Sequence, residues 1–183
     1  MNVTLQTLPP ARVAYLRYTG PYGPEIGTFW RETVAPWMIE NNLLNRVRYG
    51  IGHDDPSTTP AQYCRYDACV EVPADFEPKY PFAVTHLPGG RYAVAHFKGP
   101  ASEIPAAWGE LCGQWMPQSE LAYDQRPGFE RYPVEASYDE NSGVLEVDMC
   151  IAIKTSNTQH SSVNELNFYR ASTLNRLTRL NRN

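Results

Sequence analysis

Cysteine and histidine are the side chains that most often act as nucleophiles, bases or metal ligands, and this chain has four of each. No two cysteines have CxxC spacing, and the histidines form neither HExxH nor HxH. They are Cys64, Cys69, Cys112 and Cys150, and His53, His86, His96 and His160. The motifs GxGxxG, GxxxxGK[ST] and GxSxG are absent as well. The sequence therefore predicts reduced thiols, no metal, no cofactor and no standard catalytic machinery.

Two adjacent carboxylates, Asp54 and Asp55, precede Pro56 and offer the oxygen atoms of a ligand loop. Asp-Pro and Thr-Pro pairs are also turn formers, because Asp side chains cap the backbone of such turns. Two carboxylates without further ligands do not make a cation site. We therefore interpret this loop as a structural turn.

The strongest signal is an internal repeat. Residues 8–21, LPPARVAYLRYTGP, match residues 87–100, LPGGRYAVAHFKGP, at an offset of 79. After a one-residue deletion the match continues at an offset of 78 and includes Trp30 with Trp108 and Trp37 with Trp115. Chance does not explain two tryptophans that recur at one spacing, so we infer a duplicated unit.

Each copy shows the same succession of patterns. Alternating, β-rich segments indicate strands, and apolar residues at helical spacing indicate one helix per copy. The strands are expected at 3–8, 11–19, 47–53 and 64–73 and at 82–87, 90–98, 127–133 and 144–154, with helices at 25–40 and 103–116. The prediction is an α+β fold: a duplicated β-α-β-β unit with pseudo-two-fold symmetry, one antiparallel sheet, two main helices on one face and a groove between them. The other face is expected to be uncovered, which is compatible with a homodimer, although no particular residue indicates one.

The copies differ in their side chains, and one difference concerns a carboxylate. Glu130 lies in the segment 128–132, GFERY, and our alignment sets it opposite Gly52. Strand alternation is compatible with Glu130 on the face that carries the helices. Asp67 and Asp148, in contrast, recur in both copies, as do Cys69 and Cys150, and we assign these pairs to the fold.

Three segments in combination resemble the GyrI-like effector-binding domain. They are GHDDPSTTPAQYCRYDACVEVP (52–73), LPGGRYAVAHFKGP (87–100) and RPGFERY (126–132). The family includes ligand domains of multidrug-binding AraC-type and MerR-type transcription regulators and the free-standing DNA gyrase inhibitory protein. The resemblance covers about residues 1–154. It implies a groove that binds hydrophobic, often cationic small molecules, where a buried glutamate among aromatics contacts the positive charge; Glu130 matches that glutamate.

Two interpretations of Glu130 stay open. In one, it is a carboxylate at a sheet edge, hydrated or paired with Arg131 or another arginine. In the other, which the resemblance favours, an apolar groove raises its pKa and a cationic ligand offsets the desolvation. Aromatic walls would hold the cation on their ring faces, with core packing as the alternative for each ring. The candidate ligand-binding residues are Glu130, Trp30, Trp108, Tyr18, Tyr66 and Tyr132, whereas Trp37 and Trp115 are read as core.

Charge divides the chain into two parts. The whole carries 16 basic and 20 acidic residues, a net charge of −4, of which residues 155–183 hold +3 and residues 1–154 hold −7. We predict a domain over 1–154, with halves at about 3–73 and 82–154, and a basic C-terminal extension over 155–183. The extension has apolar residues at roughly helical spacing. A helix that docks on a partner or on the domain is one interpretation, and a solvated segment is the other.

The sequence thus predicts a stand-alone module that senses or sequesters hydrophobic, cationic small molecules. The alternatives are a protein-interaction inhibitor resembling the gyrase inhibitory protein and a hydrolase of reactive genotoxins, in which a carboxylate of raised pKa does acid–base work. An enzyme is the least favoured, because no nucleophile motif is present. No direct DNA binding is expected, because residue 1 already begins the first strand and the net charge is acidic.

Neither a membrane-length apolar run nor the features of a secretory leader are present, so we expect a cytoplasmic protein without a membrane partner. A protein partner or a homodimer stays open.

Overall fold

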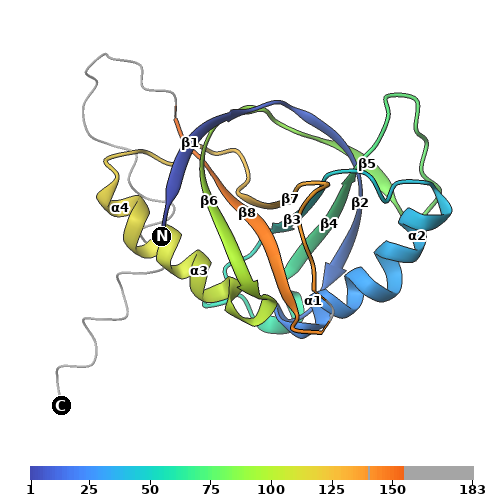
Figure 1. The fold of residues 1–183 in the computed structure, drawn as a ribbon, viewed down its shortest axis with the longest axis horizontal. Coiled ribbons are helices and arrows are strands. Elements are labelled where there is room, and N and C mark those ends of the chain that lie inside the picture. Colours follow the sequence, from blue (N-terminus) through green and yellow to red (C-terminus); the bar gives the residue numbers. More distant parts are fainter. Residues whose placement is uncertain (140, 155–183) are drawn as a thin grey trace.

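The computed structural model describes residues 1–139 and 141–154, and the basic extension expected over 155–183 lies outside them. Within these residues the chain forms an eight-stranded antiparallel sheet in the order β1-β6-β8-β7-β3-β4-β2-β5 (Figure 1). The strands are β1 (Val3–Leu8), β2 (Ala11–Thr19), β3 (Arg48–Gly52), β4 (Arg65–Glu71), β5 (Ala83–Leu87), β6 (Gly90–Pro100), β7 (Phe129–Tyr132) and β8 (Val144–Ala152). Each strand of one copy has its counterpart at the same distance from the opposite edge. The duplicated α+β fold is confirmed.

The two copies join at β3 and β7, in the middle of the sheet, where Gly50 is the Cα partner of Glu130. On their other sides, Gly50 pairs with Ala68 of β4 and Glu130 pairs with Met149 of β8. Ala68 and Met149 each precede the recurring cysteine of their copy. The repeat partner of Glu130 is therefore Gly50, two residues before the position our alignment assigned. The pseudo-two-fold axis passes between these two residues.

The short strand that precedes each copy forms as expected, but it pairs with the other copy: β1 with β6, and β5 with β2. The linkers Pro9-Pro10 and Pro88-Gly89 are responsible, because proline has a fixed φ and no N–H and favours an extended continuation over a tight hairpin. A Cβ at Gly89 would lie 2.6 Å from the backbone nitrogen of Pro10. Glycine is thus needed where the two linkers cross.

A helical stretch packs on each copy, at the positions the sequence indicated. The first stretch consists of α1 (Pro24–Phe29), the π-helical turn η1 (Trp30–Val34) and α2 (Ala35–Glu40). The second consists of the 3₁₀ turn η3 (Ala101–Glu103), α3 (Ile104–Glu110), the π-helical turn η4 (Leu111–Trp115) and α4 (Met116–Gln118). A further 3₁₀ turn, η2 (Ala61–Tyr63), lies between β3 and β4. Each π turn ends one residue before an Xaa-Pro pair, at Pro36 and Pro117. The wider turn accommodates a proline that cannot donate an intrahelical hydrogen bond. None of the helices in the described part of the chain is long and apolar enough to span a bilayer.

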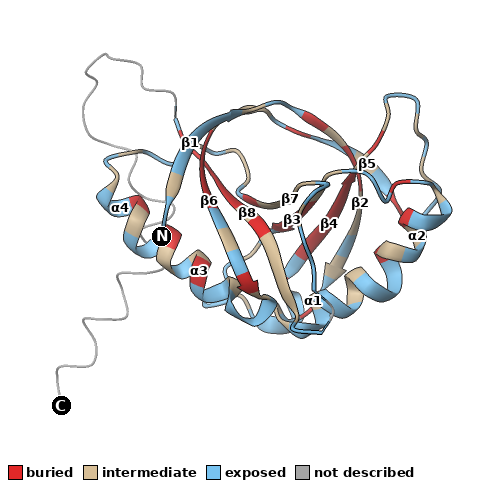
Figure 2. Ribbon diagram, viewed as in Figure 1, coloured by how far each residue is buried: buried red, intermediate tan, exposed pale blue. Residues whose placement is uncertain are grey.

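The buried residues, red in Figure 2, belong to three core clusters. On the face that carries the helices, Val34 and Met38 pack on the first half of the sheet, and Leu111 and Met116 pack on the second. The opposite face curls on itself around a third cluster drawn from both copies. Its members include Tyr49, Tyr92 and Phe129, all nearly inaccessible to solvent. The expectation of an uncovered face is therefore wrong: crossing of the first strands brings the sheet edges around, and this argument for a homodimer no longer holds.

Candidate functional site

Glu130 lies on β7 on the face that carries the helices, where three side chains donate hydrogen bonds to its carboxylate. Trp108 Nε1 lies 3.1 Å from Oε1, the Tyr132 hydroxyl lies 2.9 Å from Oε2, and the Tyr66 hydroxyl lies at a longer 3.5 Å from Oε2. Trp30 Nε1 in turn donates to the Tyr66 hydroxyl over 3.0 Å. We call these five residues the central cluster.

The symmetric scaffold places both recurring tryptophans beside the axis. Trp30 begins η1 of the first helical stretch, and Trp108 lies in α3 of the second. Their indole N–H groups find different acceptors, because only one copy supplies a carboxylate. The ring of Trp30 also lies 6.4 Å from that of Tyr132, in a tilted arrangement. Each side of the axis therefore contributes one indole to the cluster.

Gly50 makes room for the cluster. A Cβ built on Gly50 would lie 2.0 Å from the Tyr66 hydroxyl and 2.8 Å from Glu130 Oε2, both far inside van der Waals contact. Because Gly50 and Glu130 are related by the axis, a carboxylate in both copies would also bring two like charges together. The site therefore holds one carboxylate, and its repeat partner has no side chain.

Burial and hydrogen bonding act on the pKa of Glu130 in opposite directions. Burial raises the pKa of Glu130, and the hydrogen bonds from Trp108, Tyr132 and Tyr66 partly counteract the rise. Burial, followed by the nearby Glu130 charge, raises the pKa of Tyr66 and Tyr132 well above the usual value, so both hydroxyls stay protonated donors. Glu130 as a whole is partly buried, and the side chains of Trp108, Tyr132 and Tyr66 surround its carboxylate.

Within the described residues, no ion pair includes Glu130. Arg131, the partner that the alternative interpretation offered, instead donates to Asp148 over 3.2 Å. Alternation along β7 sends Arg131 to the opposite face of the sheet. The carboxylate is therefore surrounded by neutral donors and has no cationic partner in the described part of the chain.

Tyr18 does not join the central cluster. It is the Cα partner of Tyr66 on β2, but its ring packs at 5.6 Å from that of Phe29. Its hydroxyl donates to the carbonyl of Pro21 over 3.3 Å. Of the six predicted site residues, the structure thus brings together Glu130, Trp30, Trp108, Tyr66 and Tyr132 and leaves Tyr18 one strand outward.

Two neighbours of the cluster, Gly50 and Arg48, were missed by the sequence analysis. Arg48 lies two residues before Gly50 on the same face of β3, and its guanidinium carbon lies 5.9 Å from the centre of the Tyr132 ring. Both follow from the register between the strands in the structure, which sets Gly50 opposite Glu130 and so makes Arg48 the repeat counterpart of Gly128.

The other polar clusters belong to the framework. The carboxylate of Asp54 accepts from the guanidinium of Arg65 at 2.9 Å, and Asp55 Oδ1 accepts from the backbone of Ser57 at 2.8 Å, as expected of a turn. Asp67 bonds with Arg17 and His53, and Asp148 bonds with His96 and Arg131 in the matching place of the second copy. No group of three or more potential metal ligands occurs in the residues that the structure describes.

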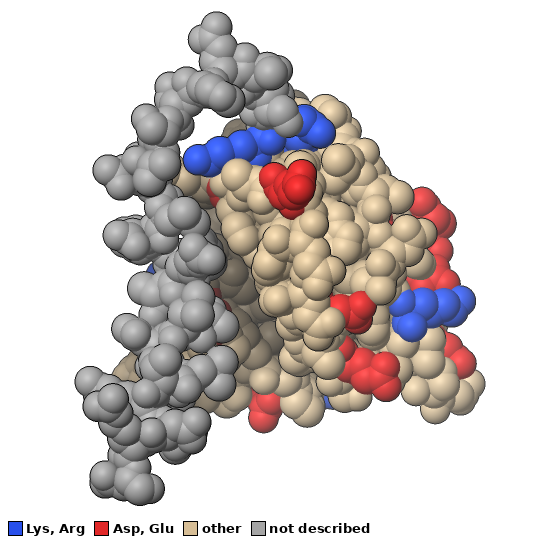
Figure 3. All heavy atoms as spheres, turned by 90° about the vertical axis from the view of Figure 1, so that its left-hand side faces the viewer, with Lys and Arg blue, Asp and Glu red and all other residues tan. Residues whose placement is uncertain are grey.

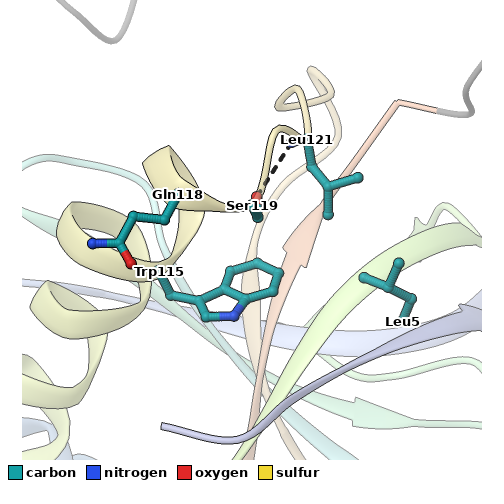
Figure 4. Close-up of a pocket in the computed structure, with 5 residues that line it drawn as sticks. All are labelled: Leu5, Trp115, Gln118, Ser119 and Leu121. Atoms are coloured by element: carbon teal, nitrogen blue, oxygen red, sulfur yellow. Dashed lines mark hydrogen bonds between the residues drawn. The ribbon is translucent and has the colours of Figure 1, made fainter.

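A separate hollow of about 390 Å³ lies beside α4 and the edge strand β1 (Figure 4). Its lining consists of Leu5, Trp115, Gln118, Ser119 and Leu121, without a charged side chain. Trp115, expected in the core, is partly buried at its wall. On the face shown in Figure 3, the described acidic and basic side chains stand scattered among uncharged ones rather than in a basic stripe that would track a phosphate backbone.

Comparison with known proteins identifies the family. The model of the GyrI-like small molecule binding domain matches residues 1–154. The chain belongs to this family. It is 35% identical over 133 residues to YosT of the Bacillus subtilis prophage SPbeta, which bears the name of a transcriptional regulator, covering 72% of this chain and 89% of that one. It is 26% identical over 159 residues to a DNA gyrase inhibitor of Cronobacter sakazakii, covering 85% and 99%.

A solved structure has the same architecture. The structure of SAV2435 bound to tetraphenylphosphonium superposes with a TM-score of 0.54 at 16% identity, over 84% of this chain and 94% of that one. At this identity the likeness shows a shared fold.

Proposed function

We propose that this GyrI-like domain binds hydrophobic, cationic small molecules at the central cluster. Glu130 supplies the counter-charge, and Trp30, Trp108, Tyr66 and Tyr132 supply apolar walls. The observation that carries the proposal is the carboxylate of Glu130, which accepts hydrogen bonds from neutral donors and has no cationic partner among the described residues.

The chemistry of the cluster favours a weakly hydrated cation. Neutral donors orient the carboxylate but leave its negative charge uncompensated, and partial burial strengthens its attraction to a positive charge. Indole and phenol rings attract cations through their faces, by about 0.5–2 kcal/mol per contact. An aryl cation loses little hydration on entry and fills the apolar space. SAV2435, which has the same fold, has been solved with the hydrophobic cation tetraphenylphosphonium bound, and this supports the proposal.

The test is a tryptophan-fluorescence titration with methyltriphenylphosphonium and its neutral analogue triphenylphosphine oxide. For Glu130→Gln we expect the affinity for the cation to fall by about tenfold or more, equivalent to ~1.4 kcal/mol, and the affinity for the neutral compound to change little. The exposed Glu135→Gln is the matched control and should bind both compounds as the wild type does. Equal affinity of wild type and Glu130→Gln for the cation would contradict the proposal.

A second function, inhibition through protein contact, is suggested by the gyrase inhibitor that aligns with this chain over nearly its own full length. Inhibition of DNA supercoiling by purified gyrase would test it. If the outer surface is responsible, Glu130→Gln should inhibit as the wild type does, and absence of inhibition by the wild type would exclude this function. Hydrolysis of reactive electrophiles stays a prediction from sequence.

A further inference from the structure

The central strands carry a second charged side chain on the face of the cluster. β3 presents Arg48 and then Gly50, and the second copy presents the equivalent positions as Gly128 and Glu130. Each copy thus contributes one charge and one glycine, with the cation from the first and the anion from the second. Strand geometry places the two charged residues roughly 8 Å apart at their Cα atoms.

Arg48 contacts the ring of Tyr132 but takes part in no ion pair among the residues that the structure describes. Its Nε atom is buried and has no hydrogen-bond partner within the described residues. Burial also lowers the pKa of Arg48, and the neighbouring Tyr132 counteracts part of that shift. Buried N–H groups without an acceptor are rare, because they lose their bonds to water and gain none in return.

Tyr132 contacts both Arg48 and Glu130 and thereby places them in one site. It is the Cα partner of Arg48, its ring lies beneath the guanidinium, and its hydroxyl donates to Glu130 over 2.9 Å. A molecule that reaches Glu130 across the ring of Tyr132 therefore also comes near Arg48. Guanidinium groups bind carboxylates through two parallel hydrogen bonds, which an ammonium group does not reproduce.

We propose that the ligand of this site is bipolar: an aromatic molecule with a cationic centre at Glu130 and a carboxylate or comparable oxygen acceptor at Arg48, less than about 1 nm away. This inference rests on the proposed role of Glu130 and adds the second half of the ligand. A lipophilic cation fills only the Glu130 half of the site, and a ligand that also carries an anionic group gains a second contact at Arg48.

Rhodamine 110 and rhodamine 123 test the inference, because they share a cationic aromatic frame and differ in a free carboxylate against its methyl ester. Fluorescence anisotropy should show the wild type binding the acid about tenfold more tightly than the ester. Arg48→Met should reduce this ratio to about one, and Arg48→Lys should retain part of it. Glu130→Gln should weaken both dyes by a similar factor.

The outcomes separate the two proposals. A ratio unchanged by Arg48→Met, with both dyes weakened by Glu130→Gln, overturns the bipolar ligand and leaves the cation site standing. Indifference of both dyes to Glu130→Gln overturns both. Thermal unfolding provides the second readout: Arg48→Met should keep the wild-type Tm without ligand, because it removes a partly buried charge that has no ion-pair partner among the described residues. A large loss of Tm would instead assign Arg48 to the fold and contradict the inference.

Discussion

The two copies of the β-α-β-β unit share their strands and helices but divide the charged groups of the site between them. The first contributes Arg48 and Gly50, and the second contributes Gly128 and Glu130. A position on the symmetry axis faces its own repeat, so a side chain there excludes its counterpart. Duplication can therefore build a symmetric scaffold around the axis, but a site placed on the axis must be asymmetric.

The two tryptophans show what happens to residues that lie away from the symmetry axis. Trp30 and Trp108 stand off the axis, so both copies retain them, and both indoles reach the cluster. Only Trp108 bonds directly to the carboxylate, whereas Trp30 acts through Tyr66. Symmetric walls with an asymmetric charge should orient a ligand in one of two otherwise equivalent directions.

The largest effect is expected from filling the space on the axis. Gly50→Ala places a methyl group 2.0 Å from the hydroxyl of Tyr66, which is buried and cannot move aside freely. We expect a loss of about 1–3 kcal/mol in the free energy of unfolding, measured by urea denaturation, together with loss of cation binding.

Gly52→Ala is the matched control on the same strand, because its Cβ would meet the hydroxyl of Tyr22 at an ordinary 3.4 Å. It should leave stability within about 0.5 kcal/mol of the wild type. If Gly50→Ala were as stable as Gly52→Ala and bound the cation normally, the steric account of the axis would be wrong.

A change of pH is expected to have a smaller effect on cation binding. The effect depends on the raised pKa of Glu130, a residue that only the second copy has. A bound cation favours the ionised carboxylate, so affinity for methyltriphenylphosphonium should increase as pH rises through that pKa, by at most about tenfold per unit. Stability should respond with the opposite sign. A carboxyl whose pKa is higher in the folded state stabilises the fold fully below its unfolded pKa, and this contribution is lost as pH rises through the folded value.

Cation titrations measure the affinity, and urea denaturation measures the free energy of unfolding, at a series of pH values. The series covers about pH 4–9, the interval in which a buried carboxyl group ionises. In Glu130→Gln the affinity should show no corresponding rise. A wild-type affinity as flat as that of the variant would remove Glu130 from the binding reaction.

The smallest effect compares the two tryptophans. Trp108→Phe removes a hydrogen-bond donor to Glu130 and should raise the pH midpoint of cation binding. Near neutral pH the free energy of cation binding should weaken by about 0.5–1.5 kcal/mol. Trp30→Phe removes a donor to Tyr66 instead and should leave the midpoint in place. Equal midpoints for the two variants would mean that the indole of Trp108 contributes only its ring.

Several features could be predicted from the sequence because their causes are local or repeated. Alternation and helical spacing indicated the strands and helices, and the recurring tryptophans revealed the duplication. The segment 126–132 identified Glu130 as the carboxylate of interest. Tyr18 was misplaced, because alternation gives the face of a residue but not the rotamer that directs its hydroxyl to Pro21.

The sequence by itself determined the duplicated α+β unit, its family and the importance of the Glu130 carboxylate, which has no counterpart in the first copy. Tertiary structure alone decided that β1 and β5 exchange between copies, that Gly50 faces Glu130, and that Arg48 lies beside Tyr132 with no ion-pair partner among the described residues. Strand propensity and alternation act over a few residues, whereas register is set by hydrogen bonds between strands distant in sequence. A shift of two residues preserves the face of every side chain, so only the neighbouring strands could distinguish Gly50 from Gly52.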